Sequence, residues 1–175
     1  DGVATIDTAT LLKGKKVVLF GLPGAYTPVC SAYHLPGFVA KADDLKAKGI
    51  SAIACISVND PFVMQTWGKE HGADGKVMML ADADGAFTRA IGLSFDMPEY
   101  GLSGRSERYS MVVEDGVVKS INIEKSVLDH GISGQAVAGR VRTEPDAVAE
   151  HVPRQVLDVL GVDLVTPPHQ QRPHL

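Results

Sequence analysis

The 175-residue chain carries a formal charge of −4 at pH 7 with its Lys and Arg residues scattered, so it has no basic patch for nucleic acid or an anionic membrane. Its hydrophobic fraction of 45% suits one ordinary core, and no apolar run approaches the roughly 20 residues that span a bilayer. Two cysteines cannot build a disulfide framework, which favours a reducing compartment and small-molecule chemistry. We therefore expect a cytoplasmic protein. Because the chain begins at Asp1 rather than Met, an organellar protein whose targeting segment has been removed is the alternative.

The first third of the chain predicts strands that alternate with helices. Residues 2–7 alternate like a short strand, and Thr8–Lys13 has the pattern of a helical turn. Lys16–Leu22 is nearly all apolar, which is typical of a central parallel strand covered on both faces. Helical spacing over Ser31–Lys48 is interrupted by Pro36-Gly37, which we expect to bend the helix or split it in two.

The middle of the chain continues this alternation. The segments that we expect are a strand over Ile50–Val58, a helix over Pro61–His71 capped by Asn59-Asp60, a strand over Lys76–Ala81, a turn over Asp82–Gly85 and a short helix over Ala86–Ile91. Cys55 lies inside the first of these strands, where a cysteine is most simply a small packed hydrophobic residue. Trp67 and His71 are interpreted as a packing residue and a surface residue.

The remainder of the chain predicts a hairpin and a helical C-terminal region. We expect a loop over Leu93–Gly104, a hairpin of Arg108–Val113 and Val117–Ile123, a loop over 126–142, a helix from Thr143 to about Leu160, and a disordered tail over 165–175. Strands that alternate with helices, followed by a hairpin, indicate an α/β fold with a central mixed β-sheet flanked by helices. The domain is expected to cover residues 1–164.

Two groups of residues invite a metal-site interpretation, and neither supports it. Asp82 and Asp84 alternate as in a calcium loop, but the fifth and twelfth positions are Ala86 and Leu93 rather than ligands. His169 and His174 stand five residues apart in the expected tail. We assign the aspartates to the turn and to helix capping, and expect no metal.

The segment from Pro23 to Cys30 carries the strongest chemical signal. It leaves the apolar run through the turn-forming pair Pro23-Gly24, and Pro28 suits the first helical positions. Cys30 then falls in the first turn of a helix, where free N–H groups and the helix dipole favour a thiolate over a thiol. Thr27 lies close enough for its hydroxyl to meet the sulfur or a molecule bound beside it. Cys30 is therefore a candidate nucleophile, and a buried structural cysteine is the alternative.

The spacing Pro-x-x-x-Thr-x-x-Cys, filled by Pro23, Thr27 and Cys30, resembles the active-site motif of the peroxiredoxins. The residues Phe20–Phe38 look like the type II, peroxiredoxin-5-like subfamily. The segments His34–Gly37, Ser57–Asp60 and Arg108–Ser110 make the match more specific, and it covers roughly residues 3–124. The resemblance implies a thioredoxin-like fold and a thiol-dependent peroxidase, an oxidoreductase that reduces hydrogen peroxide and alkyl hydroperoxides through a cysteine sulfenic acid.

The resemblance also assigns roles to individual residues. Cys30 would be the nucleophile, and Arg108 would be the active-site arginine, with a surface arginine as its alternative. Thr27 can donate or accept one hydrogen bond, and Pro23 would shield the sulfur from water. Gly24 and the N–H groups of Val29 and Cys30 would bind the peroxide.

The count of cysteines restricts how the sulfenic acid can be reduced. Some relatives carry a resolving cysteine in the C-terminal region, but no cysteine follows Cys55. We therefore expect a one-cysteine cycle that depends on an external thiol, either glutathione with glutaredoxin or thioredoxin, and that needs no haem or metal cofactor. The resemblance implies a homodimer. Two other functions stay open: a thioredoxin-fold thiol reductase, although Thr27 occupies the place of the first cysteine of Cys-x-x-Cys, and a non-catalytic interaction module.

Overall fold

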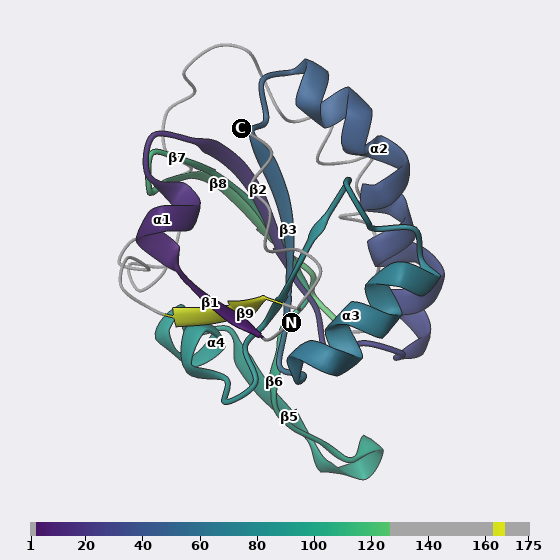
Figure 1. Ribbon diagram of the computed structural model, residues 1–175. Helices are drawn as coiled ribbons and strands as arrows, with labels where there is room; N and C mark the ends of the chain where they lie inside the picture. The colour runs from purple at the N-terminus through teal and green to yellow at the C-terminus, as the bar shows by residue number, and fades with distance from the viewer. Residues whose placement is uncertain (1–2, 127–162, 167–175) are drawn as a thin grey trace.

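A mixed β-sheet organises the computed structural model, which describes residues 3–126 and 163–166. Within these residues the sheet has seven strands in the order β1–β9–β4–β3–β2–β7–β8 (Figure 1). β2, β3 and β4 are parallel neighbours, whereas β7 pairs antiparallel with β2, and β8 with β7. The strands are β1 (Ala4–Asp7), β2 (Lys16–Gly21), β3 (Ala52–Ser57), β4 (Met78–Ala81), β7 (Tyr109–Glu114), β8 (Val117–Ile123) and β9 (Asp163–Thr166).

Helices cover both faces of this sheet, α2 and α3 on one face and α1 and α4 on the other (Figure 1). Phe20 of β2 belongs to the buried cluster under α2 and α3, and the preceding residue Leu19 belongs to the cluster under α1 and α4. Successive side chains of a strand point to opposite faces, so β2 separates two cores. The predicted α/β fold is confirmed. The helices are α1 (Thr8–Leu12), α2 (Leu35–Ala47), α3 (Pro61–Glu70) and α4 (Ala86–Ala90).

The parallel pairing of β2 with β3 determines where the candidate active site forms. Phe20 of β2 lies opposite Cys55 of β3, and both side chains are fully buried, as the apolar runs predict. Parallel neighbours end at the same edge of a sheet. The segment that follows Gly21 and the segment that follows Ser57 therefore meet, although more than thirty positions separate them in the sequence.

Aspartate side chains cap the short helices. Asp60 accepts hydrogen bonds from the N–H groups of Phe62 and Val63 at the start of α3, with Pro61 at the first position. The carboxylate of Asp82 accepts from the N–H groups of Phe87 and Thr88 of α4. The capping role predicted for Asp82 is confirmed.

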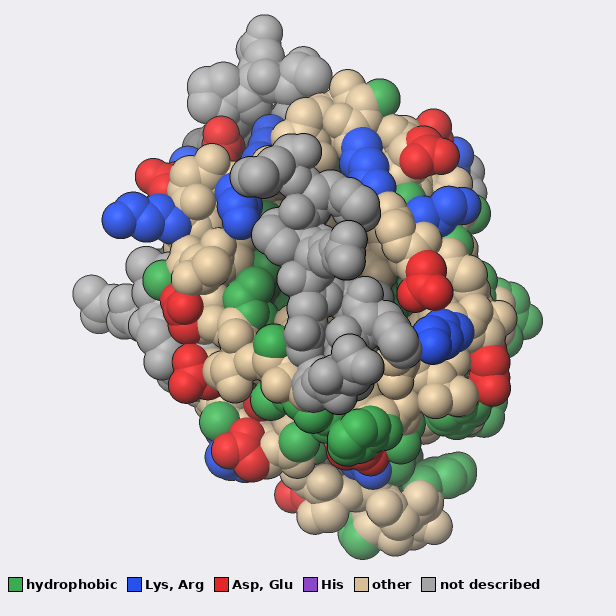
Figure 2. Space-filling model, viewed as in Figure 1, with side chains coloured by type: hydrophobic (Ala, Val, Ile, Leu, Met, Phe, Trp, Pro, Cys, Tyr) green, Lys and Arg blue, Asp and Glu red, His purple; other side chains and the backbone are tan. Residues whose placement is uncertain are grey.

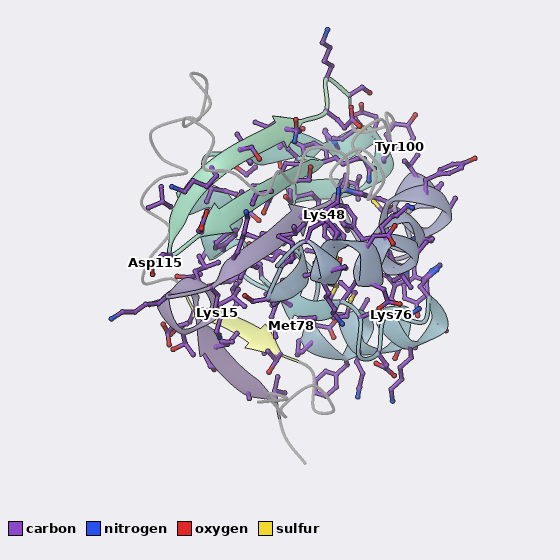
Figure 3. All side chains as sticks on the ribbon, turned by 90° about the horizontal axis from the view of Figure 1, so that it is seen from above. Lys15, Lys48, Lys76, Met78, Tyr100 and Asp115 are labelled. Atoms are coloured by element: carbon purple, nitrogen blue, oxygen red, sulfur yellow. The ribbon has the colours of Figure 1, made fainter. Side chains whose placement is uncertain are left out.

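The loop predicted over Leu93–Gly104 is wrong, because this segment forms a second, two-stranded sheet. β5 (Ser94–Met97) pairs antiparallel with β6 (Leu102–Ser106) across a 3₁₀-helix, η2 (Pro98–Tyr100). This arm extends from the body in Figure 1, and Figure 3 shows Tyr100 at the periphery. Its glycines and proline are typical of a loop, so the sequence pattern did not indicate strands. The carboxylate of Asp96 stabilises the hairpin by accepting from Ser103 Oγ and the N–H of Gly104.

The domain boundary placed at Leu164 is too early. Val165 and Thr166 belong to β9, which pairs with β1 over four residues and with β4 through Ala81 and Val165. Leu164 is fully buried, so the strand completes one of the two cores. Backbone pairing with β1 makes these residues part of the sheet rather than of a tail. The loop expected over 126–142 lies outside the described residues from 127 onwards, as do the helix expected from Thr143 to about Leu160 and residues 167–175.

Charged side chains of both signs are interspersed on the face shown in Figure 2, in agreement with the scattered charges of the sequence. At one end of the sheet the Lys15 carbonyl accepts from the N–H of Asp115, and Figure 3 shows these two residues near each other. Among the described residues, no helix combines the length and the apolar character needed to cross a bilayer.

Candidate active site

The segment between β2 and α2 brings Cys30 to the start of a helical turn. Pro28 begins this turn, as predicted, and Cys30 opens a π-helix, η1 (Cys30–His34), in which Leu35 donates its N–H to the Cys30 carbonyl five residues back. Pro36 lacks an N–H and its ring would clash with the carbonyl four residues back in an α-helix, which the wider π-turn avoids. The bend expected at Pro36-Gly37 therefore takes the form of a π-turn that leads into α2.

Arg108, immediately before β7, lies against the Cys30 sulfur. Its Nη1 atom donates to Cys30 Sγ at 3.3 Å and to His34 Nδ1 at 3.0 Å. Arg108 is only 1% exposed, so it is not the surface arginine of the alternative interpretation. The two N–H bonds of one Nη atom diverge, which lets one guanidinium nitrogen serve both partners. The structure thus brings together Cys30, His34 and Arg108 from η1 and the edge of β7.

His34 is a buried and neutral member of this group that the sequence interpretation did not assign to the site. Burial, together with the positive charge of Arg108, lowers the pKa of His34 to about 3. Arginine has no acceptor, so Nδ1 must accept and the ring proton must lie on Nε2. The ring also packs beside the stacked pair of Phe20 and Phe38, at centroid distances of 5.2 and 5.4 Å. Its position four residues after Cys30, on the same side of a helical turn, was the signal that could have identified it.

The depressed pKa of His34 predicts a pH dependence of stability. The unfolded chain binds a proton at His34 below about pH 6.5 and the folded protein does not, so the free energy of unfolding should fall as the pH decreases from 6.5 towards 3. His34→Gln keeps an acceptor for Arg108 but cannot titrate. Urea unfolding at several pH values should give a wild-type slope steeper than that of the variant by up to about 1.4 kcal/mol per pH unit. Equal slopes would show that His34 titrates normally in the folded protein.

The Thr27 hydroxyl lies in the same segment but is directed at the backbone rather than at the sulfur. Its Oγ1 atom donates to the carbonyl of Gly24 at 2.7 Å. Pro23 and Gly24 are buried and Val29 is half-buried in helical backbone geometry at the start of the π-turn. Tyr26 adopts a φ of 63°, an uncommon conformation for a residue other than glycine that turns the chain between these residues.

Asn59 holds this segment from the neighbouring strand end. Its Oδ1 atom accepts from the N–H of Ala25 at 2.9 Å and from Ser57 Oγ at 2.7 Å. We predicted that Asn59-Asp60 caps α3, and only Asp60 has this role. Asn59 instead joins the segment after β3 to the segment after β2. The sequence pattern could not reveal this contact, because it exists only where the two parallel strands end side by side.

The second cysteine has a different environment. Cys55 is fully buried in β3, and burial raises the pKa of its thiol well above the ordinary value, with a smaller contribution from nearby Cys30. Both cysteines are free thiols. Cys30 is equally buried, and it differs in receiving a hydrogen bond from the Arg108 guanidinium. The position of Cys55 within a core strand agrees with the packing role predicted for it.

Trp67 connects the site to α3. It is the single tryptophan of the chain and fully buried, as expected for a packing residue. Its Nε1 atom also donates to Ser31 Oγ at 3.0 Å, and Ser31 directly follows Cys30. The indole fluorescence should therefore report on changes at Cys30.

Comparison with known proteins identifies relatives of the chain. A family model described as Redoxin matches residues 2–133. Peroxiredoxin-2E, chloroplastic, from Arabidopsis thaliana is 50% identical over 125 residues, which are 70% of this chain and 53% of that protein. Peroxiredoxin-2B from Arabidopsis thaliana is 46% identical over 124 residues, 71% of this chain and 76% of that protein. The chain therefore spans about half of the first relative and about three quarters of the second.

The chain is also similar in fold to a protein of known structure. The crystal structure of reduced Prx3 from Vibrio vulnificus in complex with hydrogen peroxide superposes with a TM-score of 0.71 at 45% identity, covering 77% of this chain and 82% of that one. The predicted thioredoxin-like fold is confirmed by this likeness. The chain therefore belongs to the redoxin family and, within it, to the type II peroxiredoxins, which are thiol-dependent peroxidases.

Proposed function

We propose that this chain reduces hydrogen peroxide and alkyl hydroperoxides with Cys30 as the nucleophile. A sulfur electron pair of the Cys30 thiolate attacks the terminal peroxide oxygen, the S–O bond forms and the O–O bond breaks. The departing oxygen takes a proton from solvent and leaves as water or an alcohol, and Cys30 becomes a sulfenic acid. The observation that carries this proposal is the 3.3 Å contact between Arg108 Nη1 and Cys30 Sγ in the interior of the protein.

The neighbouring residues supply orientation and charge stabilisation. Fixed donors stabilise the negative charge that develops on the departing oxygen, and the Arg108 guanidinium together with the N–H groups of Val29 and Cys30 would provide them. The Thr27 hydroxyl donates its hydrogen bond to the Gly24 carbonyl, so its oxygen lone pairs are directed to accept from the peroxide O–H. Pro23 has no polar side-chain group, and its buried ring would limit the access of water to the sulfur.

The sulfenic acid is proposed to be reduced by an external thiol. The thiol sulfur forms a disulfide with Cys30 and water leaves; a second thiol then releases Cys30. Glutathione with glutaredoxin, or thioredoxin, are the reductants that we propose. The burial of Cys55 within β3 supports this one-cysteine cycle, because a thiol in a core strand is poorly placed to intercept the intermediate.

A homodimer is proposed from the surface around the site. Tyr26, Tyr33 and Phe62 are 51%, 53% and 60% exposed, and they lie on the Cys30 segment, on η1 and on the first turn of α3. Exposed aromatic residues are enriched in protein interfaces. Light scattering of the purified chain tests this, and replacement of Phe62 by Glu should shift a dimer towards a monomer.

We place the protein in the cytoplasm, or in an organelle if a targeting segment has been removed.

Intact-mass measurement tests the proposed cycle. One equivalent of hydrogen peroxide without thiol should leave a protein heavier by one oxygen, with the oxygen mapped to Cys30, and excess peroxide should add a second oxygen there. A species lighter by two hydrogens, with Cys30 joined to Cys55, would overturn the one-cysteine cycle. Rapid peroxide consumption with a thiol donor distinguishes the peroxidase from a thiol reductase or a non-catalytic interaction module, since only the peroxidase consumes peroxide rapidly.

A further inference from the structure

Asn59 and Thr27 hold opposite ends of one peptide unit. The Gly24 carbonyl accepts from Thr27 Oγ1 at 2.7 Å, and the Ala25 N–H, in the same Gly24–Ala25 peptide bond, donates to Asn59 Oδ1 at 2.9 Å. A trans peptide is planar, and its C=O and N–H groups point in opposite directions. The direction of the Ala25 N–H therefore also determines the direction of the Gly24 carbonyl, which accepts the hydrogen bond of the Thr27 hydroxyl.

The two residues directly before Asn59 are themselves held by hydrogen bonds. Ser57 Oγ donates to Asn59 Oδ1 at 2.7 Å, and the Ser57 side chain is fully buried in the last position of β3. Arg105 Nη1 of β6 donates to the carbonyl of Val58 at 3.0 Å. The backbone on the N-terminal side of Asn59 is thus connected to two sheets, which gives its side chain a rigid support.

The fit around Gly24 leaves little room for movement. A Cβ atom added at this position would lie 3.1 Å from Arg105 Nη1, 3.3 Å from Thr27 Cγ2 and 3.6 Å from Asn59 Oδ1. The peptide unit therefore packs directly against the side chains that orient it. Small displacements of a catalytic group reduce rates strongly, because the reacting atoms must be aligned.

We infer that Asn59 is a positioning residue for peroxide reduction: it orients the Gly24–Ala25 peptide, and this peptide directs the Thr27 hydroxyl so that its oxygen accepts from the peroxide. The inference rests on the proposed function. It gives Asn59 no direct contact with the sulfur or with the peroxide. Asn59 Oδ1 accepts from the Ala25 N–H and from Ser57 Oγ, so a carboxylate can replace the amide, whereas a methyl group cannot.

Four variants test this: Asn59→Ala, Asn59→Asp, Thr27→Val and the double variant Asn59→Ala/Thr27→Val. The rate constant of Cys30 with hydrogen peroxide, followed by Trp67 fluorescence or by quenching and mass measurement, should fall at least about tenfold in Asn59→Ala. Asn59→Asp should stay within about twofold of wild type. The double variant should be no more than about twofold slower than Thr27→Val alone, because Asn59 acts through Thr27.

Alkylation of Cys30 by iodoacetamide separates positioning from a change in sulfur reactivity. Alkylation needs no aligned peroxide, so its rate should be unchanged in Asn59→Ala. The matched control is Asp7→Ala, which removes an acceptor of one backbone N–H and one hydroxyl, both of Thr10, at the edge strand β1. This control should lower stability without changing the peroxide rate.

Several results would overturn the inference. A wild-type peroxide rate in Asn59→Ala, multiplicative losses in the double variant, or a loss in Asn59→Asp equal to that in Asn59→Ala would each exclude it. An equal fall in peroxide and alkylation rates would assign Asn59 to the reactivity of the sulfur instead. If wild-type Cys30 does not react with peroxide, the proposed function fails and the inference fails with it. A reactive wild type with an unaffected Asn59→Ala overturns the inference alone.

Discussion

Cys30→Ser should reduce peroxide consumption to the background level, a loss of at least about 10³-fold, while the protein stays folded. Serine keeps the size of the side chain and can still accept from Arg108 Nη1, so the packing around β2 should change little. The hydroxyl is a far weaker nucleophile than the thiolate and cannot form a sulfenic acid. A coupled assay of peroxide with a thiol donor measures the loss, and urea unfolding establishes that the variant is folded.

The matched control for this experiment is Cys55→Ala. It removes the other thiol from a fully buried position in β3, so it should lower the free energy of unfolding by about 1–3 kcal/mol and leave the peroxide rate unchanged. Substantial turnover in Cys30→Ser would remove Cys30 from the role of nucleophile. Lost activity in Cys55→Ala at unchanged stability would show that the second thiol takes part in the cycle.

Arg108→Lys should lower the rate constant with peroxide by about 10²–10³-fold, although the positive charge is kept. The guanidinium donates from one Nη atom to Cys30 Sγ and to His34 Nδ1 at the same time. A lysine ammonium is a point charge on a flexible stem and cannot reproduce the planar arrangement of donors. Single-turnover measurement of Trp67 fluorescence against peroxide concentration gives the rate constant.

Arg89→Lys is the matched control for this variant. Arg89 of α4 also donates from Nη1, in its case to the carbonyl of Asp84, but it lies with the helices on the other face of the sheet and is exposed. Its replacement by lysine should leave the peroxide rate within about twofold of wild type. A similar rate in Arg108→Lys would show that the guanidinium geometry is not needed and that charge alone is sufficient.

The sequence alone was sufficient for the elements that periodicity and capping determine. The apolar runs around Phe20 and Cys55 predicted two buried parallel strands, since a strand covered on both faces has no polar side. Pro61 and Asp60 marked the start of α3, because proline and aspartate have local roles at a helix N-terminus. The arm of β5 and β6 was missed, since its glycines and proline favour a loop until Asp96 and the pairing with β6 are considered.

Sequence resemblance also named Cys30, Thr27 and Arg108, because these residues occupy a motif with fixed spacing. Only the tertiary structure decided how they are arranged. The parallel ends of β2 and β3 bring Asn59 to the Ala25 N–H, and the π-turn with β7 brings His34 and Arg108 to one sulfur. These contacts join residues separated by 34 and 74 positions, and hydrogen bonds over such separations have no local sequence signature. The sequence thus determined the residues available for the chemistry, and the sheet topology determined which of them meet.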